Sequence, residues 1–412
     1  MKSVMILGAA AGQVPFIERC KSSDYRVIVI SPEGNYPGFK MADKRYYFDT
    51  RDKEGILKAA RLENIDAILS DQTDVSIPSV AYVSEKMGLK SIGYQTSLSF
   101  TDKYRMREKA KGLGIAVPDF AKASTLQEAQ AALQRIGFPA MIKPVDSSGS
   151  RGVFKINGAE ELERYFDRSL SFSHEKSVIV EGFIRGREYI ADGLAIDRRY
   201  LQTDLGIKEY FRKENLFISK MCMFSSARSI NDPAELAVLE TDRAVVEGFG
   251  LEFGLTHGEY IVGEDDGKAY LVEVAARGGG LYISSDLTPR ACGINTNDIL
   301  IDFVVEGKSV PVEKLSLTEG VSAWVCFELA PGRIIEIKGR DLVKTLPGVF
   351  RADIDDLYVG EYVEEMVNDA NKKGPVLIEA GTREECYRYI QRVKDTLDVV
   401  VDSGGAMAHI IW

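Results

Sequence analysis

Residues 256–280 contain the feature that most limits how this chain can fold, a predicted β-hairpin with charged residues at fixed spacing. One apolar strand precedes the run Glu-Asp-Asp-Gly and a second follows it. Gly267 ends that run, where a three-residue loop requires a positive φ. If the loop is Asp265–Gly267, Ile261 faces Leu271 across the hairpin. A two-residue Asp-Gly turn would shift the pairing by one residue, so the spacing alone leaves the register open.

The three-residue loop would also place Glu259 opposite Glu273. Two carboxylates directly opposite each other on a sheet repel, so they persist only if both point to water or if a cation lies between them. Arg277 shares the alternation of Glu273, and glycines occupy positions 278–280. Carboxylates, an arginine and glycines together indicate a site for a hard metal ion and phosphate groups. A solvated surface hairpin is the alternative.

The composition indicates a globular protein with enough apolar residues to form a core. The chain has 412 residues, 45% of them hydrophobic, and a net charge of −10. Such an acidic chain is disfavoured as a general nucleic-acid binder. No stretch is apolar enough to span a bilayer, and the first residues are too short an apolar run for a signal peptide. The five cysteines are scattered without metal-ligand spacing, so we expect reduced thiols in a cytoplasmic protein. From the charge and the lack of an apolar span, we expect neither nucleic-acid nor membrane partners.

The first part of the chain predicts a small parallel α/β domain. The expected elements are strands Val4–Leu7, Arg26–Ile30, Ala67–Ser70 and Lys90–Ile92, and helices 14–21, 53–63 and 76–87. The first strand, glycine turn, helix and second strand form a βαβ unit. The turn Gly8–Gly12 lacks the third small residue of a dinucleotide fingerprint, and no acidic residue follows at the next strand tip. A dehydrogenase is therefore disfavoured.

The pattern changes near residue 96. Thr101 or Asp102 is a candidate N-cap for a charged helix that ends at Lys111. An α+β region follows, with helices 125–136, 158–168 and 232–250 and strands Ala140–Lys143, Gly152–Ile156, Ser177–Glu181, 187–197, 200–208 and 217–225. Past Gly307, a third segment is expected to contain strands 321–329, 333–337 and 375–380 and helix 382–396.

Two loops in the middle region have the composition of a nucleotide site. The first follows the strand that bears Lys143 and is rich in serine and glycine, whose hydroxyls and N–H groups suit a triphosphate. The second begins at Glu181 and reaches Glu188, a spacing that can bring backbone groups against a purine and carboxylates near its amino group and its ribose. An ordinary turn and a strand end with surface acids are the alternatives.

Together, these motifs resemble the ATP-grasp superfamily, in the branch of biotin carboxylase, carbamoyl-phosphate synthase and ATP-dependent carboxylate–amine ligases. The resemblance runs through most of the chain. It implies nucleotide contacts from Lys103, Lys143, Ser148, Ser150, Gly152, Glu181, Phe183 and Glu188, with the Glu181 side chain and the Phe183 backbone at the adenine and Glu188 at the ribose. It also implies that Glu259 and Glu273 hold magnesium and that Arg277 and Lys143 are catalytic.

The resemblance implies an α/β fold with three domains. An N-terminal Rossmann-like pre-ATP-grasp domain is expected at 1–98, a two-part α+β ATP-grasp domain at 99–307, and a small C-terminal α/β domain at 308–412. Within the second domain, the lid subdomain is expected at about 118–186. A homodimer is a further expectation from the resemblance.

One position departs from the family pattern. Ala275 stands where the usual Glu-x-Asn-x-Arg pattern has asparagine, which removes one oxygen from the ligands available to a metal. Magnesium keeps water molecules readily and can fill such a gap. The form Glu-x-Ala-Ala-Arg-Gly-Gly resembles the amino-acid ligases that make dipeptides more than it resembles biotin carboxylase.

The implied function is an ATP-dependent ligase that joins a carboxylate and an amine, with an amino acid as a substrate. The reaction passes through an acyl phosphate and releases ADP and phosphate. The expected cofactors are ATP and Mg²⁺, as two ions, with Mn²⁺ as a substitute. The alternatives are a bicarbonate-activating enzyme similar to a carboxylase or carbamoyl-phosphate synthase, and a non-catalytic ATP-binding regulatory protein, which the missing asparagine keeps open.

Overall fold

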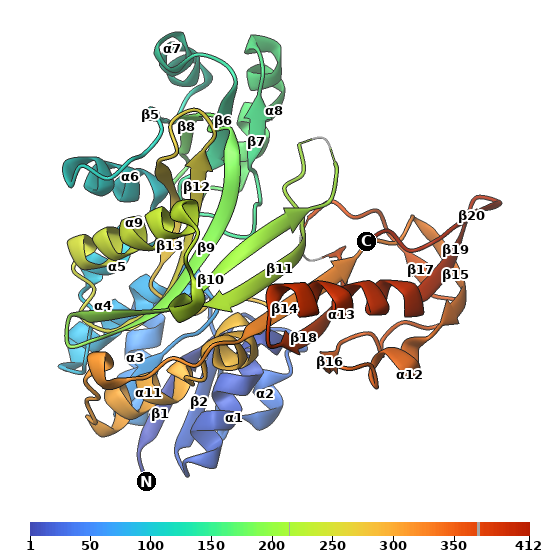
Figure 1. The fold of residues 1–412 in the computed structure, drawn as a ribbon. Coiled ribbons are helices and arrows are strands. Elements are labelled where there is room, and N and C mark those ends of the chain that lie inside the picture. The colour runs from blue at the N-terminus through green and yellow to red at the C-terminus, as the bar shows by residue number, and fades with distance from the viewer. Residues whose placement is uncertain (214, 369–370) are drawn as a thin grey trace.

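The computed structural model describes residues 1–213, 215–368 and 371–412. Its N-terminal unit, at the bottom of Figure 1, is a four-stranded parallel sheet in the order β3-β2-β1-β4. The elements are β1 (Ser3–Leu7), β2 (Arg26–Ser31), β3 (Lys44–Tyr47), β4 (Ala67–Leu69), α1 (Val14–Ser22), α2 (Gly38–Met41), α3 (Lys53–Glu63) and α4 (Ile77–Met87). The predicted βαβ order of β1, α1 and β2 is confirmed.

Two details of this unit differ from the sequence-based prediction. β3 is absent from the expected elements because its sequence, Lys-Arg-Tyr-Tyr, contains no apolar run, and it forms a mostly exposed edge strand. Residues 90–92, in contrast, form no strand. The chain there leads to Gly93, whose φ of +85° precedes the short helix α5 (Tyr94–Ser99).

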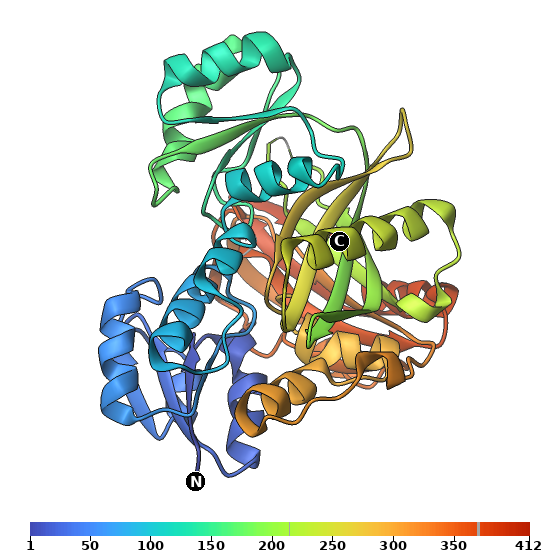
Figure 2. The ribbon, with the colours of Figure 1, turned by 90° about the vertical axis from the view of Figure 1, so that its left-hand side faces the viewer.

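A second unit, residues 120–182, forms what we call the lid, at the top of Figures 1 and 2. Its antiparallel sheet has the order β5-β8-β6-β7. The elements are β5 (Phe120–Ala123), β6 (Ala140–Pro144), β7 (Phe154–Ile156), β8 (Val178–Gly182), α7 (Leu126–Ile136) and α8 (Ala159–Ser171). The apolar side chains of these strands and helices form a separate hydrophobic cluster, so the lid has its own core.

The largest sheet has eight strands in the order β13-β12-β9-β10-β11-β14-β18-β16. The strands are β9 (Gly186–Ile196), β10 (Arg199–Tyr210), β11 (Ser219–Ser226), β12 (Gly254–Gly263), β13 (Ala269–Ala275), β14 (Val321–Phe327), β16 (Val349–Ala352) and β18 (Lys373–Ala380). The helix α9 (Pro233–Phe249) lies across one face of it (Figure 2). The sheet is continuous from β11 to β14, so the predicted domain boundary at residue 307 falls between strands of one sheet.

The rest of the C-terminal segment forms a smaller sheet in the order β17-β15-β19-β20, at the right of Figure 1. The elements are β15 (Gly332–Lys338), β17 (Tyr362–Val363), β19 (Asp398–Ser403), β20 (Ala406–Ala408), α12 (Arg340–Val343) and α13 (Arg383–Thr396), and two short helices, α10 (Thr288–Cys292) and α11 (Thr296–Ile301), precede them. In the described ranges, no helix combines the length and the apolarity needed to cross a membrane.

The hairpin of β12 and β13 places Glu259 opposite Glu273, as the three-residue loop predicted. The rest of the predicted pairing is wrong. Ile261 faces Tyr270 rather than Leu271, because the loop at the tip is one residue longer than expected. A β-bulge farther along β13 adds a residue to that strand and restores the register before the two carboxylates.

A buried arginine holds the bulge in place. Arg107, in the helix α6 (Lys103–Gly112), is fully buried and donates from Nη2 to the carbonyl oxygen of Val272 at 2.6 Å. The same nitrogen lies 3.0 Å from Oε2 of Glu181, at the end of β8. One guanidinium therefore joins α6, the hairpin and the lid. Because both charges are buried, removal of Glu181 would leave Arg107 without a carboxylate, and removal of Arg107 would leave Glu181 with only Lys143, 3.5 Å away, as its cation.

We expect Arg107→Met to lower the free energy of unfolding by about 3–5 kcal/mol, because the Glu181 carboxylate and the Val272 carbonyl lose their donor. Urea denaturation followed by circular dichroism measures the change. Arg105→Met on the same helix is the matched control, because the side chain of Arg105 is 52% exposed and its contact with Asp102 is long, at 3.8 Å. A loss no larger for Arg107→Met than for this control would contradict the structural role of the buried pair.

A buried carboxylate also lies between α9 and the large sheet. Asp242 accepts hydrogen bonds from Tyr200 Oη at 2.8 Å, from Gln202 Nε2 at 2.9 Å and from Tyr260 Oη at 2.9 Å. Burial disfavours the charged form and raises the pKa of Asp242 from 3.8 to about 6, although the three donors oppose the rise. The folded state therefore holds this proton more tightly than the unfolded state does.

This raised pKa predicts a specific pH dependence of stability. As the pH rises from 4 to 7, the unfolded chain releases the Asp242 proton first, so folding loses about 2 kcal/mol through this group. In Asp242→Asn, the fall in the free energy of unfolding between these two pH values should be smaller by that amount. Guanidinium titrations of both proteins at pH 4 and pH 7 measure the difference, and parallel pH profiles would refute the assignment.

Candidate active site

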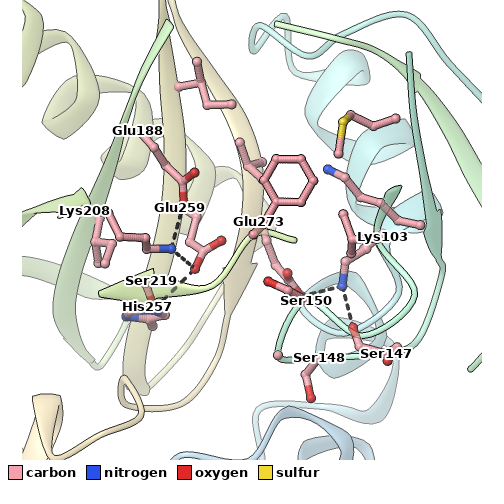
Figure 3. A pocket seen from close by; sticks show the side chains of 18 of the residues that line it. Lys103, Ser147, Ser148, Ser150, Glu188, Lys208, Ser219, His257, Glu259 and Glu273 are labelled. Atoms are coloured by element: carbon pink, nitrogen blue, oxygen red, sulfur yellow. Dashed lines mark hydrogen bonds and ion pairs between the residues drawn. The ribbon is translucent and has the colours of Figure 1, made fainter. Parts of the chain in front are cut away.

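A cavity of about 500 Å³ lies between the lid and the large sheet. Figure 3 shows the serine-rich loop after β6 on one side of it and the carboxylates of the hairpin on the other. Asp74 extends the lining to the N-terminal unit, and Trp324 extends it to β14. The predicted site residues that line it are Lys103, Lys143, Ser148, Ser150, Glu181, Phe183, Glu188, Glu259, Glu273 and Arg277.

Gly152 is the predicted site residue that does not line the cavity. It has a φ of +75°, and a Cβ built on it would lie 2.8 Å from Cγ of Pro144 and 2.9 Å from the ring of Phe172. Its carbonyl oxygen accepts a hydrogen bond from Ser169. The glycine therefore allows the loop to close against its own unit, while the serines at 148 and 150 face the cavity.

Lys103 is at the start of α6, directly after the N-cap Asp102, whose side chain accepts from the backbone N–H of Arg105. Only 5% of the Lys103 side chain is exposed. Its Nζ donates to the carbonyl oxygen of Ser147 and to Oε1 of Glu273, both at 2.7 Å (Figure 3). One ammonium group thus connects the serine loop to one of the two opposed carboxylates.

Lys208 on β10 neutralises the other carboxylate, and the motif-based prediction missed it. Its Nζ lies 2.7 Å from Oε1 of Glu188 and 2.7 Å from Oε1 of Glu259. Burial alone would lower the pKa of Lys208, but the charges of the two glutamates raise it well above its ordinary value. Burial alone would raise the pKa of Glu259, but the charge of Lys208 lowers it to about 2. A lysine within the mostly buried run of β10 was the available signal in the sequence.

Glu181 is 2% exposed, and its carboxylate contacts both Arg107 and, at 3.5 Å, the Nζ of Lys143. Burial would raise the pKa of Glu181, but the charges of Arg107 and Lys143 together lower it. The carboxylate is therefore committed to two cations inside the protein. Its clearest structural effect is to hold the Lys143 ammonium at the cavity wall.

The segment after β8 has fewer backbone groups available to the adenine of a nucleotide than the resemblance implied. The backbone N–H of Phe183 donates to the carbonyl oxygen of Pro139 at 3.1 Å, so this N–H is already used within the protein. The Phe183 ring lies 4.1 Å from the Nζ of Lys155. Ile184, the next residue, also lines the cavity.

Arg277 is bound by a carboxylate that the sequence did not single out. Its Nε lies 2.8 Å from Oδ1 of Asp74, and its Nη2 donates to Oδ2 at 2.9 Å. Its Nη1 donates to the carbonyl oxygen of Gly278. Burial would lower the pKa of Arg277, but the Asp74 charge raises it. Asp74 follows the carboxyl end of β4, the edge at which parallel sheets bind ligands, and this position was the signal for it.

His257 lies opposite Ala275 in the hairpin and lines the same cavity. Its Nδ1 is 2.7 Å from Oδ1 of the buried Asp192, and its Nε2 is 4.0 Å from Oε1 of Glu259. The bond to Asp192 fixes the orientation of the imidazole ring, so a polar group stands beside the carboxylates at the position where the asparagine oxygen is missing.

The opposed carboxylates fit a magnesium ion that a phosphate group shares. In the described part of the chain, no cluster of three or more His, Cys, Asp or Glu side chains could hold a metal by itself. Glu259 and Glu273 each use Oε1 for a lysine, which leaves Oε2 of each for a cation. Mg²⁺ commonly binds through one or two carboxylates and completes its shell with phosphate oxygens and water. The donor set therefore suits a phosphorylated ligand with its metal.

The ATP-grasp domain family matches residues 136–286 of this chain. This region therefore matches the ATP-grasp domain that the sequence motifs predicted. The alanine–anticapsin ligase of Bacillus subtilis is 25% identical over 283 residues, which cover 63% of this chain and 58% of that protein. The L-arginine-specific L-amino acid ligase of Bacillus subtilis is 29% identical over 258 residues, 59% of this chain and 60% of that protein. The matches thus span about three fifths of these relatives.

Solved structures confirm the predicted α/β fold class over nearly the whole chain. The L-amino acid ligase from Bacillus licheniformis superposes with a TM-score of 0.81 at 20% identity, covering 98% of this chain and 99% of that one. The phosphoribosylglycinamide synthetase from Anaerococcus prevotii gives a TM-score of 0.74 at 17% identity, with 97% and 99% coverage. The N-terminal unit, the lid, the large sheet and the C-terminal segment therefore belong to one shared fold.

Proposed function

We propose that this protein is an ATP-dependent carboxylate–amine ligase with an amino acid as a substrate, and that it releases ADP and phosphate. The observation that carries the proposal is the convergence of Lys103, Lys143 and Lys208 with two opposed carboxylates and Arg277 on one cavity of an ATP-grasp domain. Lysines and metal-binding carboxylates suit a transferring phosphoryl group, and a guanidinium suits a carboxylate. The names of both curated relatives, which are ligases of amino acids, support the substrate class.

In this proposal, the lid side of the cavity binds the nucleotide. Lys103 and Lys143 neutralise the phosphates, and the serine loop at 147–152 covers them. The base lies against Phe183 and the carbonyl groups of that segment, and Glu188 accepts from the ribose. Glu259 and Glu273 would hold the magnesium, as one or two ions, and Mn²⁺ would fit the same oxygens. When bound, the metal would neutralise charge on the transferring phosphoryl group.

The proposed reaction has two steps. A carboxylate oxygen of the first substrate attacks the γ-phosphorus of ATP, the bond to the β–γ bridging oxygen breaks, and ADP leaves. The amine nitrogen then attacks the acyl carbon, loses a proton and displaces phosphate. Arg277 binds the carboxylate and then the acyl phosphate with its planar fork, and Asp74 holds that fork in orientation. Closure of the lid would keep water from the acyl phosphate.

The setting of the activity is also a proposal. The resemblance supports a homodimer in the cytoplasm that acts on small molecules. The mass in solution, measured by light scattering coupled to size-exclusion chromatography, tests the dimer. A monomeric mass at the concentration of the activity assay would remove the dimer from the proposal without affecting the reaction.

The reaction class is tested by incubating the protein with ATP, Mg²⁺ and pairs of amino acids. We expect amino-acid-dependent release of ADP and phosphate in equal amounts, together with a new amide detected by mass spectrometry. AMP and pyrophosphate would exclude the acyl-phosphate route. ADP release that requires bicarbonate and no amino acid would instead favour the carboxylase alternative.

The role of Arg277 is tested by Arg277→Lys, which keeps a cation beside Asp74 but removes the fork. We expect kcat/KM to fall by at least ~100-fold, with nucleotide affinity within about threefold of the original, because the fork contacts the acyl group rather than ATP. Isothermal titration with ADP measures the affinity. A variant with lost nucleotide binding and normal turnover per bound ATP would show that the assigned role is wrong.

A further inference from the structure

The cavity extends beyond the opposed carboxylates along one row of the large sheet. Lys208 on β10 lies opposite Cys222 on β11, and Cys222 lies opposite Trp324 on β14. All three side chains line the cavity. Residues directly opposite each other on neighbouring strands project to the same face of a sheet. This row therefore forms a continuous floor that runs from the phosphate end of the cavity to the C-terminal segment.

Beyond Lys208, the floor and wall of the cavity are apolar. The side chains of Ile190, Cys222, Ile283 and Trp324 line the extension and belong to one hydrophobic cluster. Each of these residues is at most 4% exposed. The Nζ of Lys372 lies 4.5 Å from the centre of the Trp324 ring and closes that end. An apolar group of a ligand in this space would therefore contact mainly carbon atoms of these side chains.

The carboxylates of the cavity already have cationic partners. Each carboxylate that lines it contacts a cationic side chain: Asp74 contacts Arg277, Glu181 contacts Arg107, Glu188 and Glu259 contact Lys208, and Glu273 contacts Lys103. The oxygens that stay free, Oε2 of Glu259 and Oε2 of Glu273, belong to the metal end of the cavity, and the described residues that line the extension include no carboxylate to receive a guanidinium or ammonium group of a ligand. A cationic side chain in the extension would therefore lose its water without gaining a partner.

The segment that begins at Gly280, which also contributes to the lining, is held in a strained conformation. Leu281 and Tyr282 have φ values of 50° and 62°, in the left-handed region that residues other than glycine rarely adopt. Arg351 on β16 donates to Tyr282 Oη at 2.8 Å and lies over the Tyr282 ring. Gly280 lines the cavity, and a Cβ built on it would meet nothing within 4 Å. The space beside Gly280 is therefore open.

We infer that this extension is the subsite for the side chain of the amino acid whose carboxylate Arg277 receives. It takes an aliphatic rather than a cationic side chain, and Trp324 sets the length that fits. The inference rests on the proposed function, which gives Arg277 its carboxylate. Gly280 is three positions after Arg277 in the sequence. A substrate whose carboxylate binds the guanidinium therefore has its side chain beside Gly280 and above the floor that ends at Trp324.

The kinetic test uses glycinamide as the amine, so that the added amino acid supplies the carboxylate. We expect kcat/KM for leucine to exceed that for arginine by at least ~100-fold, because the arginine side chain finds no partner. Trp324→Ala should raise the ratio of kcat/KM for phenylalanine over leucine by ~10-fold, since it deepens the subsite. Gly280→Ala should lower the ratio for leucine over alanine by ~10-fold, since its methyl group occupies open space.

Trp412→Ala is the matched control. Trp412 is the other of the two tryptophans, packs against Phe327 and does not line the cavity. Its substitution should leave both ratios unchanged. If Trp324→Ala and Gly280→Ala also leave them unchanged while turnover continues, the subsite is assigned wrongly and the proposed reaction stands.

A binding test does not depend on turnover. In Trp412→Phe, Trp324 is the remaining tryptophan, so its emission reports on the end of the subsite. With a non-hydrolysable ATP analogue and Mg²⁺ present, leucine should shift or quench the emission and arginine should not. An equal response to arginine or glutamate would overturn the inference. A response to leucine without ADP release in any assay would support the subsite and refute the proposed reaction.

Discussion

Two carboxylates held face to face on neighbouring strands repel each other, and the site exists because other parts of the chain supply the opposite charge. Glu273 takes its cation from Lys103 at the start of α6, and Glu259 takes its cation from Lys208 on β10. The hairpin therefore reaches its charge balance only when α6 is docked and β10 is in place on the far side of β9. The site is therefore complete only when the tertiary fold is complete.

Much of the fold could be predicted because the local patterns agree with the final structure. The period of the apolar residues predicted the βαβ order and the strands of the hairpin, and the start of α6 was predicted with Asp102 as one of two candidate N-caps. The exact pairing within the hairpin could not be predicted. Its tip loop is one residue longer than the glycine suggested, and the bulge that corrects the register is held by Arg107, a residue 165 positions away from Val272.

The candidate site could also be predicted only in part from the sequence. Motif residues such as Lys103 and Glu273 could be found because each lies in a short recognisable stretch. Lys208 and Asp74 were missed, because their roles depend on Glu259 and Arg277, which are 51 and 203 positions away in the sequence. Gly152 was predicted to contact the nucleotide because it lies in a loop of the phosphate-binding type. In the structure, this glycine allows the loop to pack against Pro144.

The large sheet passes without interruption from β10 to β14, although more than a hundred residues separate these strands in the chain. One continuous sheet therefore carries both the phosphate end and the far end of the cavity, while different stretches of the gene encode the two ends. Substitutions on β14 can accumulate without altering the groups that handle phosphate. An architecture of this kind lets descendants of one ancestor keep their energy-coupling chemistry and diverge in what they join.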